Sequence, residues 1–247
     1  MVYQGSKNKL AKYIVPIIQN IIDENNITTY VEPFVGGANI IDKINCLYKT
    51  GSDNNKYVIK LLEYARDNPN IPIAPESCSF EHYKDVRDSY NKCDGRYSDE
   101  YISLIGYCAS YGGRFFDGGY GRDSKGGRSI YTKRLKNLKS QSEDLSDINF
   151  RIKDYHEYKP DDYNNCLFYC DPPYRNTKQY AKQNINYDQF YDWCRNMSKN
   201  NIVIISEYNM PEDFECVWSK ERKVMQKSDR VEADKATEKL FIKSRIL

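Results

Sequence analysis

The sequence is poor in features that often assign a chain to a class at first sight. It has two histidines and, among eight cysteines, no Cys-x-x-Cys pair, so the common zinc motifs are missing. A site built from Cys78, His82, Cys93 and Cys108 would match no common tetrahedral spacing, and we expect no metal centre. The formal net charge is only +2, which argues against a polybasic nucleic-acid coat and against an acidic tail.

Long hydrophobic runs are missing as well. The aliphatic run Ile202–Ile205 is far shorter than the roughly 20 residues of a membrane span, and the N-terminus lacks the apolar stretch of a signal peptide. The mean hydropathy is −0.80, although 40% of the residues are hydrophobic and 14% are aromatic, which supports a packed core. We expect a globular protein that stays in the cytoplasm with its cysteines reduced and has no membrane partner.

What is present is an α/β pattern. Thr29–Glu32 is a short β-prone run, a turn follows at Pro33–Gly37, and we expect a helix from about Ala38. A second strand, Tyr48–Ser52, ends at Asp53, which follows the turn by 16 residues, near the offset at which an acid reaches a ribose. This order predicts the opening of a nucleotide-binding α/β sheet.

Two helical segments accompany these strands. Apolar residues recur at helical spacing over residues 7–26, where Ser6 is placed to cap the start. Pro16 should kink this helix or divide it in two, because proline lacks the N–H that a helix interior needs. Residues 55–66 form the second helical stretch.

The α/β pattern resumes near residue 150. We expect a helix at Tyr187–Met197 and strands at Asn149–Lys153, Cys166–Cys170, Ile202–Ser206, Glu215–Ser219 and Lys239–Ile242. The predicted fold is therefore a Rossmann-like α/β sheet interrupted by an insertion. We assign residues 1–78 and 148–247 to the sheet domain and residues 79–147 to an inserted subdomain.

The insertion has its own composition. Eight of the 13 glycines lie between residues 106 and 127, which favours loops or hairpins over regular helix. Residues 114–139 hold eight basic and two acidic side chains with interleaved aromatic rings, a pattern typical of a nucleic-acid-binding face. A solvated loop followed by an amphipathic helix at 129–140 is the alternative. The candidate DNA contacts are Arg114, Tyr120, Arg122, Lys125, Arg128 and Lys133.

The most informative residues are Asp171-Pro172-Pro173-Tyr174, directly after an apolar strand. Two consecutive prolines fix φ and remove two backbone donors, so the chain should leave the strand as a stiff loop with unused carbonyls. A carboxylate and a carbonyl that face one cavity form a double acceptor, which suits an exocyclic amine that donates two hydrogen bonds. Tyr174 adds a ring on which a planar base can stack.

Together these residues resemble the Dam-type N6-adenine DNA methyltransferases (D12 class, alpha arrangement), particularly those of bacteriophages. The resemblance covers nearly the whole chain, because the motifs follow the family's order of cofactor turn, recognition segment and catalytic loop. It implies a site-specific enzyme that uses S-adenosylmethionine to methylate double-stranded DNA in a bacterial or phage-infected cytoplasm, as in restriction–modification. The matching segments are Tyr3-Gln4-Gly5-Ser6-Lys7, Val31-Glu32-Pro33-Phe34-Val35-Gly36-Gly37, Ser52-Asp53-Asn54, Asp154-Tyr155, Asp171-Pro172-Pro173-Tyr174, Ser206-Glu207-Tyr208-Asn209 and Glu238-Lys239-Leu240-Phe241.

The resemblance also implies a cofactor site. Asp53 would accept hydrogen bonds from the ribose, and Asp154 and Tyr155 would receive the adenine. Phe34 and the two glycines after it would form the turn under the methionine moiety, although the turn reads Gly36-Gly37-Ala38 rather than Gly-x-Gly. Lys7, with Tyr3 beside it, would neutralise the methionine carboxylate or orient the catalytic aspartate. The implied cofactor-binding residues are Tyr3, Lys7, Phe34, Gly36, Gly37, Asp53, Asp154, Tyr155 and Asp171.

The implied catalytic residues are Asp171, Pro172 and Tyr174. Hydrogen bonds from adenine N6 to the Asp171 carboxylate and the Pro172 carbonyl would aim the nitrogen lone pair at the methyl group. Because N6 is paired inside a duplex, the base would be flipped out and stacked on Tyr174, while residues 106–140 grip the DNA.

Several alternatives stay open. The same loop could methylate cytosine N4, although Asp rather than Ser before Pro172 favours adenine. The chain could also be a catalytically silent methyltransferase-fold DNA-binding regulator, or act on RNA. Neither the recognition sequence nor the choice between a monomer and a weak dimer on DNA follows from the sequence.

Overall fold

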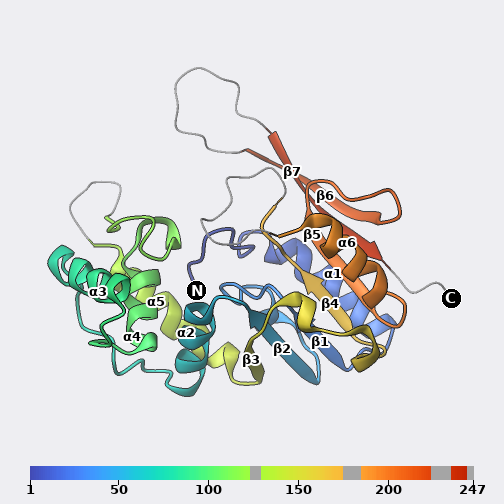
Figure 1. The fold of residues 1–247 in the computed structure, drawn as a ribbon. Coiled ribbons are helices and arrows are strands. Elements are labelled where there is room, and N and C mark those ends of the chain that lie inside the picture. Colours follow the sequence, from blue (N-terminus) through green and yellow to red (C-terminus); the bar gives the residue numbers. More distant parts are fainter. Residues whose placement is uncertain (123–128, 175–184, 224–234, 244–247) are drawn as a thin grey trace.

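A seven-stranded sheet forms the centre of the computed structural model, which describes residues 1–122, 129–174, 185–223 and 235–243 (Figure 1). The strand order is β3-β2-β1-β4-β5-β7-β6. Strands β1 to β5 are parallel, and β7 is antiparallel to both of its neighbours. The strands are β1 (Thr29–Glu32), β2 (Tyr48–Asp53), β3 (Ile148–Ile152), β4 (Leu167–Cys170), β5 (Ile202–Glu207), β6 (Glu215–Lys223) and β7 (Lys235–Lys243).

The strand order confirms the predicted Rossmann-like sheet. It reverses between β1 and β4, since β1 pairs with β2 on one side and with β4 on the other. In open α/β sheets, ligands bind outside the carboxyl ends of the strands at such a reversal. All seven predicted strands are confirmed, and β6 and β7 are longer than predicted because Lys220–Lys223 continue to pair with Lys235–Glu238.

Helices cover both faces of the sheet. The helices are α1 (Ala11–Glu24), α2 (Lys56–Asp67), α3 (Phe80–Lys92), α4 (Asp99–Cys108), α5 (Tyr131–Gln141) and α6 (Tyr187–Met197). Alternate residues of the central strands point to opposite faces. Tyr30 and Tyr169 therefore belong to the hydrophobic cluster that contains α1, whereas Val31 and Phe168 belong to the cluster that contains α6.

Three sequence predictions about local structure need correction. Ser6 does not cap α1, because its Oγ accepts from the Asn8 N–H (3.2 Å) and the helix begins only at Ala11. Pro16 does not divide the helix, which continues through it to Glu24; the proline lies on an exposed face. No α-helix begins near Ala38, which has φ +54° and is followed by a single 3-10 turn at Ile41–Lys43.

The segment predicted to be an insertion contains α3, α4 and α5 (green in Figure 1). Helix α4 packs against α2, and α3 and α5 pack against α4. The helix at 129–140 that the alternative interpretation of this segment expects is present as α5. The glycine-rich stretch starts later than expected, because α4 continues through Gly106 to Cys108. A Cβ at Gly106 would lie 2.5 Å from the Phe115 ring, so glycine here allows a close approach. Within the residues that the structure describes, no helix is long and apolar enough to cross a membrane.

Candidate active site

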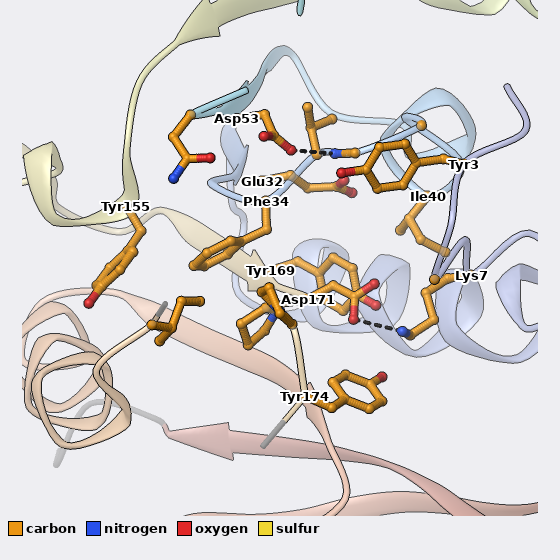
Figure 2. Close-up of a pocket in the computed structure, with 18 of the residues that line it drawn as sticks. Tyr3, Lys7, Glu32, Phe34, Ile40, Asp53, Tyr155, Tyr169, Asp171 and Tyr174 are labelled. Atoms are coloured by element: carbon orange, nitrogen blue, oxygen red, sulfur yellow. Dashed lines mark hydrogen bonds and ion pairs between the residues drawn. The ribbon is translucent and has the colours of Figure 1, made fainter. Parts of the chain in front are cut away.

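A cavity of about 530 Å³ lies at the carboxyl ends of β1, β2 and β4, where the strand order reverses. Such a volume suits a small organic ligand. Figure 2 shows Tyr155 on one side of the cavity, with Tyr3 and Lys7 on the other. All the residues that the sequence assigned to cofactor binding or catalysis line it, namely Tyr3, Lys7, Phe34, Gly36, Gly37, Asp53, Asp154, Tyr155, Asp171, Pro172 and Tyr174.

Asp53 ends β2 and is held by backbone donors. Its Oδ2 accepts from the Gly36 N–H at 3.2 Å, as Figure 2 shows. Its Oδ1 accepts from the Asn55 N–H at 2.9 Å. Burial raises the pKa of the Asp53 carboxyl to about 6, and the two N–H donors oppose the shift. A carboxylate offers more lone pairs than these two bonds use, so hydroxyl donors can still bind to it.

The glycine turn after β1 is packed from two sides. Gly36 has φ +46°, and a Cβ there would lie 2.8 Å from the Tyr3 ring, so the position requires glycine. Gln141, at the end of α5, donates its Nε2 to the carbonyls of Gly37 (3.2 Å) and Ala38 (3.1 Å). The inserted segment is therefore hydrogen-bonded directly to the turn at the sheet reversal.

Aromatic rings form one wall of the cavity. The Phe34 and Tyr155 rings stack with centroids 5.5 Å apart and planes inclined by 28°. Next to them, the Asp154 Oδ2 accepts from the Asn54 Nδ2 at 3.0 Å, and its Oδ1 accepts from the His156 N–H at 3.3 Å. This end of the cavity combines a flat apolar surface with a fixed carboxylate, which is the chemistry that a purine needs.

At the opposite end, the side chain of Lys7 meets that of Asp171, 164 residues further along the chain. The Lys7 Nζ lies 2.7 Å from the Asp171 Oδ1 and 3.4 Å from the Glu238 Oε1 (Figure 2 shows the first contact). Of the two roles expected for Lys7, this geometry fits the orientation of Asp171. Burial would lower the pKa of Lys7, but the two carboxylates reverse the shift and raise it. Burial raises the pKa of Asp171 to about 6, which the Lys7 charge opposes and the Glu238 charge reinforces.

The double-proline loop presents its acceptors unequally. The Tyr187 hydroxyl donates to the Pro173 carbonyl, whereas no donor among the described residues binds to the Pro172 carbonyl. Tyr174 donates its hydroxyl to the Glu238 carboxylate, and its ring lies edge-to-face with Tyr208, at 4.6 Å between centroids. Asp171 and Pro172 both line the cavity.

Glu32, at the end of β1, is a further buried acid of the cavity. The Tyr30 hydroxyl donates to its Oε1 at 2.7 Å. Burial raises the pKa of Glu32 well above its usual value, and the nearby Asp171 and Asp42 charges reinforce the shift. Burial and these charges favour the protonated carboxyl, whereas the Tyr30 hydrogen bond opposes them.

The candidate DNA contacts lie on the insertion, outside the cavity. Arg114, Arg122 and Lys133 are exposed. Tyr120 is partly buried: its hydroxyl donates to the Cys78 carbonyl at 2.6 Å, and the Arg122 guanidinium lies 5.8 Å from its ring centroid. Lys125 and Arg128 fall outside the described residues.

Some cavity residues were not assigned a role from the sequence. Glu238 and Tyr208 belong to recognised segments, but nothing in their local pattern placed them beside Lys7 and Tyr174. Asn186 and Gln189 begin α6 and carry no motif. Other residues without an assigned role are Asn39, Ile40, Asn54, Tyr169 and Ile185. These residues reach the site only through the packing of distant segments.

Comparison with known proteins decides the family. Residues 3–225 match the model of the D12 class N6 adenine-specific DNA methyltransferases. The chain belongs to this family. It is 26% identical over 218 residues, 78% of its length, to the type II methyltransferase M.FokI of Planomicrobium okeanokoites. That alignment covers 31% of M.FokI, so the chain spans about a third of this curated relative's length.

One solved structure also resembles the D12-class chain. It is the crystal structure of SMU.472, a protein assigned as a methyltransferase and solved in complex with SAH. The match covers 60% of this chain and 46% of that chain, with 9% sequence identity and a TM-score of 0.25. This similarity is too low to carry an argument, so the fold assignment rests on the strand order and the family match.

The donor set of the cavity fits S-adenosylmethionine, the methyl donor that membership of this methyltransferase family implies. A buried carboxylate on β2 suits a ribose diol, and the Phe34–Tyr155 wall suits an adenine ring. The described part of the chain holds no group of three or more His, Cys, Asp or Glu side chains able to bind a metal ion.

Proposed function

We propose that the chain is a site-specific DNA methyltransferase that methylates the N6 amino group of an adenine flipped out of the duplex. One observation carries the proposal: Asp171 and Pro172, which follow β4 directly, both line a ligand-sized cavity at the reversal of the sheet. An exocyclic amine has two hydrogens to donate, and the Asp171 carboxylate and the Pro172 carbonyl can accept them.

The cofactor would be held by residues from three segments. Asp53 would bind the ribose hydroxyls, and Phe34, Tyr155 and Asp154 would hold the adenine. Gly36 and its neighbours would lie beneath the amino-acid end. When bound there, S-adenosylmethionine supplies a methyl group on a positively charged sulfur.

The chain's own residues would then set the geometry of the target amine. The N6 lone pair of adenine is delocalised into the ring, so the amine is a weak nucleophile. Hydrogen bonds to Asp171 and Pro172 favour a pyramidal nitrogen and orient its lone pair. Lys7 holds Asp171 in position through the 2.7 Å contact. Alignment of this kind contributes up to roughly 7–11 kcal/mol in favourable intramolecular reactions.

DNA binding would be the task of the inserted subdomain, residues 79–147. Its exposed Arg114, Arg122 and Lys133 suit phosphate contacts, and Tyr174 would stack on the flipped base. Lys125 and Arg128 belong to the same proposed contact set. We place the activity in the cytoplasm of a bacterial or phage-infected cell, with the protein acting as a monomer or as a weak dimer on DNA.

The test is to express the chain in a bacterial host that lacks DNA methyltransferases and to sequence the DNA by a single-molecule method. We expect N6-methyladenine within one short motif. Asp171→Ala should lower the rate of transfer by about 100- to 1,000-fold or more, because the amine loses its charged acceptor. Binding of S-adenosylhomocysteine, measured by calorimetry, should largely survive.

The exposed Asp161 provides the matched control. Asp161→Ala removes the same group from the surface and should leave transfer unchanged. N4-methylcytosine in place of N6-methyladenine would refute the choice of base. Tight cofactor binding with no methyl on DNA would indicate a silent DNA-binding regulator, and methyl on RNA alone would refute the choice of DNA.

A further inference from the structure

Glu238, on β7, is a buried acid that the mechanism above does not use. Its side chain is fully buried, with 0% of its surface exposed. It contacts two residues of the cavity, because its Oε1 lies 3.4 Å from the Lys7 Nζ and also accepts from the Tyr174 hydroxyl. Strand β7 thus reaches the double-proline loop and the N-terminal segment at the same point.

The arrangement sets two carboxylates against one cation. Asp171 and Glu238 both lie within 4 Å of the Lys7 ammonium. A buried carboxylate is costly unless it is compensated, and one carboxylate would already compensate Lys7. The lysine is therefore shared between the proposed catalytic group and a second buried acid.

We propose that Glu238 is a positioning residue for methyl transfer, which shares the Lys7 ammonium with Asp171 and fixes the Tyr174 hydroxyl, so that the Asp171 carboxylate stays available to the target amine. This inference rests on the proposed function. An ammonium bonded to Asp171 alone would compete with the amine for the carboxylate, because both donate to it.

The charges around Asp171 give the inference a measurable sign. Its carboxyl is surrounded by Lys7, Glu238, Glu32, Tyr169 and Tyr174. Burial raises the pKa of Asp171 most, the Lys7 charge lowers it, and the Glu238 charge raises it. Removal of the Glu238 charge should therefore lower the pKa of Asp171 and strengthen the hold of Lys7 on it.

The decisive variant is Glu238→Gln, which keeps the side-chain shape and an acceptor for the Tyr174 hydroxyl but removes the charge. We expect a turnover number about tenfold lower at the pH optimum, with an acid limb of the rate profile displaced to lower pH. Glu238→Asp, which restores the charge, should return the acid limb towards the wild-type position. Glu215→Gln makes the same change on exposed β6 and should alter neither quantity.

A measurement without catalysis separates this inference from the proposed function. Carbon-13 NMR titration of the Asp171 carboxyl, assigned from the Asp171→Ala spectrum, should give a lower pKa in Glu238→Gln than in the wild type. An unchanged pKa overturns the inference even in an active enzyme. So does an unchanged turnover number, or a loss of rate without movement of the acid limb. Failure of the wild type to methylate DNA refutes the proposed function instead, while the titration still reports on the contact.

Discussion

Lys7→Met is the perturbation that tests the charge balance of the site most directly. Methionine keeps an unbranched side chain, has sulfur in place of the Cδ methylene, and removes the ammonium. Lys7 is 6% exposed and is 2.7 Å from Asp171 and 3.4 Å from Glu238, so the variant leaves two carboxylates without their shared cation. The exposed Lys9 allows a matched control, Lys9→Met.

The expected loss of stability follows from this distance. At an effective dielectric constant of about 20, unit charges separated by 2.7 Å attract by about 6 kcal/mol, which is an upper bound on the contribution of the pair. The variant no longer has to bury a charged lysine, which offsets part of the lost attraction. Removal of one partner from a buried ion pair typically costs about 3–5 kcal/mol of stability. We expect a loss of about 3 kcal/mol in the free energy of unfolding at pH 8. For a chain of this length, that lowers the melting temperature by about 6–12 °C.

The pH dependence has a defined sign. Burial already raises the pKa of Asp171 to about 6, and loss of the Lys7 charge should raise it further. A carboxyl whose pKa is higher in the folded state destabilises the fold above that pKa, and the penalty disappears as the pH falls towards the unfolded value. The difference between wild type and Lys7→Met should therefore be large at pH 8 and much smaller at pH 5.

Urea unfolding followed by circular dichroism at both pH values measures the difference. Lys9→Met should match the wild type throughout. A loss below about 1 kcal/mol at pH 8, or an equal loss at both pH values, would refute the reasoning. In activity assays, the acid limb for Lys7→Met should move to higher pH, the opposite of the direction expected for Glu238→Gln.

Two further predictions concern the cofactor end of the cavity. Asp53→Asn should weaken binding of S-adenosylmethionine by about 10- to 100-fold, because a hydrogen bond to a charged group contributes about 1.5–3 kcal/mol. If calorimetry gives the wild type and Asp53→Asn the same affinity for S-adenosylmethionine, the assignment of Asp53 to the ribose is wrong. Gln141→Leu should lower the free energy of unfolding by about 1–3 kcal/mol, because the Gly37 and Ala38 carbonyls lose a buried donor. Chemical denaturation measures this free energy, with Ser140→Ala as the control. If Gln141→Leu loses no more free energy of unfolding than Ser140→Ala, the hydrogen bonds from Gln141 to the glycine turn do not stabilise the fold.

The sequence determined the sheet and the list of candidate residues. Strand periodicity is local, so Thr29–Glu32 and Tyr187–Met197 were predicted with the observed ends. Motifs are local as well, and between Tyr3 and Tyr174 they identified eleven residues that line the cavity. Local signals failed where contacts outside the segment decide its conformation: the turn at Ala38 is fixed by packing and hydrogen bonds from elsewhere, and no helix forms there.

Only the tertiary structure decided how these residues act on one another. Lys7, Asp171 and Glu238 come from the start, the middle and the end of the chain, and no spacing rule relates them. The strand order brings the carboxyl ends of β1, β2 and β4 together, and β7 adds Glu238 from the far side of β5. A pKa depends on burial and on charges a few ångströms away, so the electrostatics of the site follow from this assembly rather than from any local pattern.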